Sequence, residues 1–105
     1  MEQIEVLVLL DIAGLEDKQK FEKHVVKEGF SVLEDENFVY TAKSSTTTFS
    51  TKAYILEVFK KGLHKQDFKG EANLIFLLNE TPYPAYYFDK KTNDFELVEE
   101  TKEDK

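Results

Sequence analysis

Asp11 has the position best suited to chemistry among the side chains of this 105-residue sequence. It comes directly after the apolar run Ile4–Leu10. A carboxylate at the end of a buried strand could share a hard cation such as Mg²⁺ with its counterpart in a symmetric dimer. An Asp that closes a strand and stabilises the following turn is the commoner arrangement. The position therefore favours a structural role, with a Mg²⁺ site as the alternative.

The remaining polar side chains indicate no catalytic site and no cofactor. His24 and His64 are the only two histidines, they have no cysteine to accompany them, and their spacing does not match a helical metal-binding pair. We therefore expect both imidazoles on the solvated surface. The hydroxyl-rich segment Ser44–Thr51 lacks the glycines of a phosphate-binding loop. Its composition indicates a polar loop and then a helix with Ser50 as its N-cap.

The segment Pro82–Phe88 is the most aromatic part of the chain, and it supplies the candidate interface residues Tyr83, Tyr86, Tyr87 and Phe88. Tyrosine and phenylalanine are favoured at the apolar centre of protein interfaces, and aromatic rings can also stack on nucleotide bases. The acidic neighbours Glu80 and Asp89 disfavour base stacking. Packing inside the domain and a protein interface both stay open, and a strand added to a partner's sheet would combine them.

The composition argues against nucleic acid and against a membrane as partners. The net charge is −7 and all fourteen cations are lysines, so no guanidinium is available to grip phosphate with two bonds. The absence of cysteine excludes disulfide scaffolds, thiolate metal sites and cysteine nucleophiles. No apolar run is long enough to span a bilayer, and Glu2 and Glu5 stand where a signal peptide carries cations. We therefore expect a cytoplasmic protein whose acidic surface suits protein partners.

The hydrophobic pattern predicts a single domain over residues 1–98 and a disordered, acidic and lysine-rich tail over residues 99–105. In chain order it predicts a strand at Ile4–Leu10, a helix near 16–28, strands at Phe30–Leu33 and Phe38–Ala42, a helix near 51–61 that ends at Gly62, a strand at Ala72–Leu78, and short strands at Ala85–Phe88 and Phe95–Val98. Pro82 and Pro84 bar an ordinary central strand after Leu78, because proline cannot donate to a ladder.

This order of elements is that of an α+β, ferredoxin-like βαββαβ fold, with an antiparallel sheet, two helices on one of its faces and an extra C-terminal strand or hairpin. The first and fourth strands are expected side by side at its centre. The expected core consists of Val6, Val8, Leu10, Phe21, Val25, Ile55, Phe59, Leu74 and Phe76.

Four stretches of the chain, VLVLLDIAG, FEKHVVKEGFSVL, NFVYTAKSS and ANLIFLLNETPYPAYYF, lie within residues 4–88. Their residues and order resemble the Cas2-like group of small ferredoxin-fold proteins, which includes CRISPR-associated Cas2 proteins, VapD-type nucleases and an antitoxin endoribonuclease. The resemblance implies that fold and a homodimer. Only Asp11 maps onto a functional position of the group, the acid after the first strand that holds metal across the dimer in active members.

Two functions follow from these observations. The net charge, the lack of arginine and the aromatic segment favour a non-catalytic protein-interaction module, such as an antitoxin-type or phage-encoded modulator. The resemblance alone supports the alternative, a metal-dependent endoribonuclease that acts on RNA through Asp11 and Mg²⁺. In both cases we expect a homodimer whose interface includes residues 83–98, because an exposed aromatic segment needs a cover.

Overall fold

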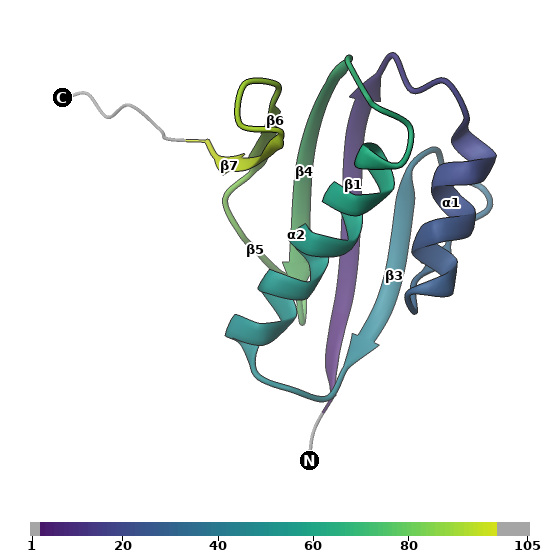
Figure 1. Ribbon diagram of the computed structural model, residues 1–105. Helices are drawn as coiled ribbons and strands as arrows, with labels where there is room; N and C mark the ends of the chain where they lie inside the picture. Colours follow the sequence, from purple (N-terminus) through teal and green to yellow (C-terminus); the bar gives the residue numbers. More distant parts are fainter. Residues whose placement is uncertain (1–2, 99–105) are drawn as a thin grey trace, which may run out of the picture.

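The computed structural model describes residues 3–98 and shows one antiparallel sheet with both helices on the same face of it (Figure 1). The strands are β1 (Ile4–Ala13), β2 (Ser31–Val32), β3 (Val39–Ser44), β4 (Glu71–Leu78), β5 (Thr81–Pro82), β6 (Tyr86–Asp89) and β7 (Asp94–Leu97). The helices are α1 (Lys18–Lys27) and α2 (Thr48–His64). The strand order is β2-β3-β1-β4-β6-β7, and β5 also pairs with β4.

The predicted ferredoxin-like βαββαβ fold is wrong in the number and order of its strands. The sheet has seven strands, and beyond β4 it continues to β6 and β7, with β5 also on β4. The cause is a tight turn at Asn79 and Glu80, both with positive φ, which returns the chain along β4 at once. The Tyr83 N–H donates to the main-chain oxygen of Phe76. Because neighbouring residues of a strand point their main-chain groups in opposite directions, the nitrogen of Pro82 faces away from β4, and no hydrogen bond to β4 is lost.

A one-residue bulge separates β5 from β6. Leu77 lies opposite Pro82 and Leu74 lies opposite Tyr86, so that the two residues between them on β4 face the three residues 83–85. An extra residue of this kind bends a strand and shifts by one residue the alternation of its side chains between the two faces of the sheet. Residues three apart in a regular strand would face opposite sides of the sheet. Because of the bulge, Tyr83 and Tyr86 lie on the same side, the helix side, and both stack on Phe76.

The core lies between the helices and the sheet. All nine predicted core residues are buried, and β1 and β4 pair as expected along Val6–Ala13 and Glu71–Leu78. Tyr40, Phe21 and Phe59 form an aromatic cluster with ring centroids 5.5 to 6.3 Å apart. Because large apolar side chains contribute most when they are fully buried, this cluster is the main link between α1, α2 and β3.

Both helices begin at a side chain that accepts a main-chain hydrogen bond. The Asp17 carboxylate accepts from the Lys20 N–H, and the Thr47 hydroxyl accepts from the Ser50 N–H. The N-cap of α2 is therefore Thr47 and not the predicted Ser50. The predicted end of α2 at Gly62 is also wrong, because the helix continues to His64.

Gly62 is instead the point where α2 meets α1. A Cβ atom at this position would lie 2.8 Å from the Phe21 ring and 3.2 Å from the His24 ring. These distances are shorter than van der Waals contact, so only glycine permits this approach of the two helices.

Candidate functional site

The sheet face opposite the two helices is not covered by any element within residues 3–98 (Figure 1). Because side chains alternate along a strand, Leu7 and Leu9 turn to this face while Val6 and Val8 face the helices. Ile75 and Leu77 of β4 lie directly opposite Leu9 and Leu7, and Val39 of β3 lies opposite Leu9 on the other side. We call this set the outer-face strip: Leu7, Leu9, Val39, Ile75 and Leu77.

The outer-face strip leaves apolar surface exposed at the centre of the sheet. Ile75 is 37% exposed although it belongs to one of the two central strands, and the other four side chains of the strip are partly exposed. Complete burial of a fully exposed side chain of this kind contributes roughly 1.5–3 kcal/mol. The side chains of the strip are already partly buried, so covering them would gain a fraction of that amount each. Because large contiguous apolar patches on folded domains mark interaction sites, the outer-face strip is the candidate site of this structure.

A row of polar side chains borders one end of the strip. Asp11 lies opposite Asn73, Asn73 lies opposite Tyr87, and Tyr87 lies opposite Glu96. The other end carries Glu5 and Lys43, whose charged atoms are 3.9 Å apart. One end of the uncovered face is therefore acidic and the other has a balanced charge pair.

Asp11 does not close its strand, because β1 continues to Ala13. Its exposed side chain lies on the uncovered face beside Asn73. A site for Mg²⁺ needs several oxygen ligands that converge on one point. Within residues 3–98 no group of three or more acidic or histidine side chains is placed to hold a metal ion. The oxygen-bearing side chain directly opposite Asp11 is that of Asn73.

The aromatic segment is divided between the two faces of the sheet. Tyr83 and Tyr86 stack on Phe76, and Phe88 is buried against Phe68 and Phe95. Tyr87 is 39% exposed on the uncovered face. Of the four predicted interface residues, Tyr87 is thus the one that adjoins the outer-face strip, and a homodimer through residues 83–98 stays a prediction.

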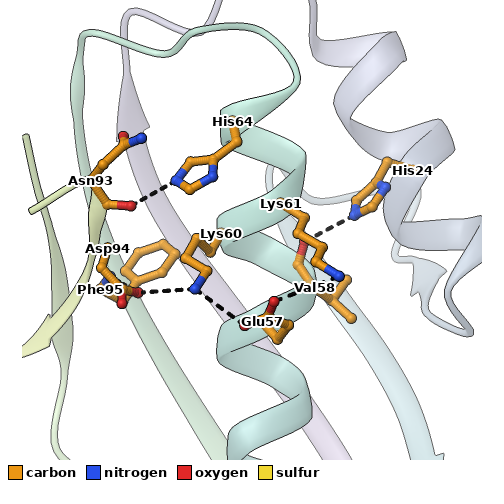
Figure 2. A network of polar contacts seen from close by, with 9 residues as sticks. All are labelled: His24, Glu57, Val58, Lys60, Lys61, His64, Asn93, Asp94 and Phe95. Atoms are coloured by element: carbon orange, nitrogen blue, oxygen red, sulfur yellow. Dashed lines mark hydrogen bonds and ion pairs between the residues drawn. The ribbon is translucent and has the colours of Figure 1, made fainter.

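The two histidines connect elements. His24 is buried, and its Nε2–H donates to the main-chain oxygen of Val58 at 3.0 Å. Nε2 of His64 donates to the main-chain oxygen of Asn93 at 2.6 Å, which holds the loop between β6 and β7 against α2 (Figure 2). The expectation of a surface imidazole is therefore wrong for His24. Spacing alone could not show this, because the burial of His24 depends on the close approach at Gly62.

A cluster of charges on α2 also contacts the β6–β7 hairpin. Glu57 lies 3.2 Å from Lys60 and 3.6 Å from Lys61, and Lys60 also lies 3.7 Å from Asp94 (Figure 2). The hydrogen bond from Lys60 and the positive charges of both lysines lower the pKa of Glu57. Lys60 is mostly covered, but its acidic partners and Lys61 are half exposed or more, so the cluster orients the hairpin and contributes little to stability.

Comparisons with known proteins bear on none of these surfaces. No protein-family model matches the chain, and no curated protein and no solved structure matches it. The resemblance to the Cas2-like group stays a prediction. Within residues 3–98, no helix is long and apolar enough to cross a membrane.

The outer-face strip was not foreseen from the sequence, although a signal for it exists. Ile4–Leu10 and Ala72–Leu78 are apolar at nearly every position, which is typical of strands covered on both faces. Residues 3–98 form only two helices, and both lie on the same face of the sheet. An all-apolar strand pair with too few helices to cover it therefore predicts an exposed apolar face.

Proposed function

We propose that this protein is a non-catalytic interaction module that acts as a homodimer, with the outer-face strip as the centre of the dimer interface. The exposure of Ile75, in a central strand of the sheet, is the observation that carries the proposal. Two sheets that pack face to face bury such side chains between them. Tyr87 lies at the border of this surface, where tyrosine is favoured in interfaces.

The charges at the two ends of the strip select one orientation of the dimer. A two-fold axis in the plane of the interface and parallel to the strands would lay the acidic end of one copy over the acidic end of the other. A two-fold axis in the plane of the interface and perpendicular to the strands places this acidic end over the end of the partner that carries the Glu5–Lys43 pair. Because like charges repel across an interface, we propose the perpendicular arrangement.

The cellular setting is part of the same proposal. A cytoplasmic dimer with a net charge of −7 suits basic protein partners, as expected for an antitoxin-type or phage-encoded modulator. The lack of arginine weighs against a nucleic-acid partner.

Sedimentation equilibrium at tens of micromolar tests the dimer. We expect the wild type to be dimeric and Ile75→Lys to be monomeric, because each interface would gain two buried ammonium groups. Val26→Lys is the matched control, since Val26 is 51% exposed on α1, far from the strip in the fold. Circular dichroism confirms that each variant folds. A monomeric wild type, or a dimer that survives Ile75→Lys, contradicts the proposal.

An assay on structured and single-stranded RNA with Mg²⁺ or Mn²⁺ tests the absence of catalysis. We expect no cleavage by the wild type, because Asp11 and Asn73 provide too few ligands in one chain. Asp11→Asn, purified in the same way, serves as the control. Robust cleavage by the wild type that is lost in Asp11→Asn would make the metal-dependent endoribonuclease the better assignment.

A further inference from the structure

A cavity lies on the helix side of the sheet, at the opposite end of β3 from its contact with β2. Its volume is about 340 Å³, and it opens between the first turns of α2, the chain before β2 and the last residues of β3. Val6, Phe30 and Ile55 provide an apolar floor, and Ser50 and Tyr54 lie at its rim. The size and the apolar floor suit one large apolar side chain or a small ligand.

Within the part of the chain that the structure describes, the edge of β3 beside this cavity has no paired strand. β3 extends to Ser44, whereas its pairing with β2 ends at Thr41 opposite Ser31. The Leu10 N–H donates to the main-chain oxygen of Phe38, and the Leu33 N–H donates to that of Val39. Main-chain groups alternate in direction along a strand, so those of even-numbered residues in β3 point towards β1 and those of odd-numbered residues point towards β2. The N–H and C=O of Lys43 therefore point to the side where β2 has already ended, and they have no main-chain partner within residues 3–98.

The charges around the cavity favour a positively charged ligand. Glu28 lines the cavity, takes part in no ion pair within residues 3–98, and lies 3.1 Å from the Tyr54 hydroxyl. The ammonium of Lys43 lies on the uncovered face beside Glu5, so it does not neutralise Glu28. The net charge of −7 adds a field of the same sign.

We propose that an extended segment of a partner protein docks here. Its main chain pairs with the N–H and C=O of Lys43, one apolar side chain enters the cavity, and a neighbouring cation lies beside Glu28. Main-chain pairing with side-chain pockets is the usual way in which a strand edge takes up a peptide. The free main-chain groups distinguish a polypeptide from a small apolar ligand, because a small ligand would leave both of them unused.

A second copy of this chain fits the cavity poorly. Of the two strands at the ends of the sheet, β2 has only two residues, and β7 carries Asp94 and Glu96. These carboxylates would approach Glu28, and like charges disfavour that contact. The partner is therefore a different, basic polypeptide, and this surface is separate from the outer-face strip on the other face of the sheet.

An array of acetylated, amidated seven-residue peptides tests the proposal, with the sequence Lys-Thr-Lys-X-Thr-Lys-Thr and every amino acid in turn at X. Affinity is measured by fluorescence anisotropy, and the site is located by amide chemical shifts of ¹⁵N-labelled protein. We expect the tightest binding when X is Phe or Leu, the weakest when X is Asp, and the largest shift at the Lys43 amide.

Two variants, Lys43→Pro and Lys43→Ala, distinguish the contribution of the Lys43 main chain to peptide binding from that of its side chain. Proline removes the outward N–H at an edge where it is tolerated, so we expect about tenfold weaker binding of the Phe peptide. Alanine keeps the N–H and should bind as the wild type does. Glu28→Gln should weaken binding and reduce its dependence on salt. Circular dichroism checks that all three variants fold.

Three results would overturn the proposal: affinity that does not depend on X, equal binding by Lys43→Pro and wild type, or shifts centred away from Lys43. Ile75→Lys should bind the Phe peptide unchanged. A failure of the dimer and a failure of peptide docking are therefore distinguishable.

Discussion

The Tyr40 hydroxyl is buried between α1 and β3 and donates to a Glu22 carboxylate oxygen at 2.8 Å. Burial, together with the hydrogen bond to Glu22 and its negative charge, raises the pKa of Tyr40 far above the ordinary value. The folded protein thus keeps this proton at alkaline pH, whereas the unfolded chain loses it near pH 10. The stabilisation is complete below about pH 10 and is lost as the pH rises above that value.

We therefore expect Tyr40→Phe to change the alkaline unfolding of the protein. The free energy of unfolding of the wild type should fall above about pH 10 by up to 1.4 kcal/mol per pH unit more than that of the variant. Urea unfolding at pH 7, 9 and 11 measures this difference. The two proteins should differ by a constant amount between pH 7 and 9, where the hydroxyl is neutral in both states. A constant difference up to pH 11 would contradict the assignment.

Gly62→Ala tests the contact of the helices at the scale of one methyl group. The added Cβ would overlap the Phe21 ring, which is buried and cannot turn away. We expect a loss of about 1–3 kcal/mol in the free energy of unfolding, although alanine favours helix in exposed positions. Lys61→Ala, on the exposed side of the same helix, should change stability by less than about 1 kcal/mol. Chemical denaturation of both variants makes the comparison.

At the scale of elements, the turn between β4 and β5 contains one residue, Glu80, that is poorly suited to its backbone conformation. Asn79 and Glu80 have φ values of 51° and 68°, and the Asn79 side chain accepts a hydrogen bond from the Glu5 N–H at 2.9 Å. Asparagine tolerates this region, but glutamate does so at a cost. The pairing of Leu78 with Thr81 imposes the turn in spite of that cost.

Glu80→Gly should accordingly stabilise the protein by about 1 kcal/mol, because Asn-Gly is the preferred sequence of such a turn. Thermal unfolding measures the gain. Glu36→Gly is the control, since Glu36 is an exposed loop residue without positive φ and should gain nothing from glycine. A loss of stability in Glu80→Gly would contradict the strained turn.

The elements that the sequence predicted are those with a strong, uninterrupted pattern. Val6, Val8 and Leu10 alternate towards the helices, and Phe21 and Val25 share one face of α1, so their burial followed from periodicity alone. The strand at Pro82 and the bulge after it could not be foreseen, because Tyr83, Tyr86 and Phe88 are spaced by three and then by two residues. That spacing matches neither a strand nor a helix, and only the pairing with β4 explains it.

At the scale of the whole molecule, the acidic surface opposes the association that the outer-face strip favours. Each copy carries a net charge of −7, so two copies repel each other through water. Salt screens this repulsion within about 10 Å at 0.1 M, while apolar burial does not weaken. We expect the dimer dissociation constant to fall several-fold between about 0.02 and 0.5 M NaCl.

Sedimentation equilibrium across this range of salt measures that change. Binding of the cationic Phe peptide at Lys43 should weaken over the same range, since its attraction to Glu28 is screened. Opposite salt dependences for the two surfaces are therefore the expected result. A dimer that dissociates in salt would indicate an interface held by ion pairs and would contradict the apolar strip.

The candidate site was the part that the sequence predicted least well. Asp11 and the aromatic segment drew attention by residue type, whereas the outer-face strip consists of ordinary leucine, isoleucine and valine. What makes the strip a candidate is that no element within residues 3–98 covers it, because both helices lie on the other face of the sheet. That arrangement is a property of the whole fold and of no single segment.

The bulge opposite Ile75 and Phe76 has a consequence for the gene. Loss of one codon at Pro84 or Ala85 would join β5 and β6 into one regular strand and leave Tyr83, Tyr86 and Phe88 on the side they now occupy. Loss of one codon inside β4 would turn every later side chain of that strand to the opposite face. Descendants of this gene can therefore vary in length at the bulge while their central strand stays fixed in length.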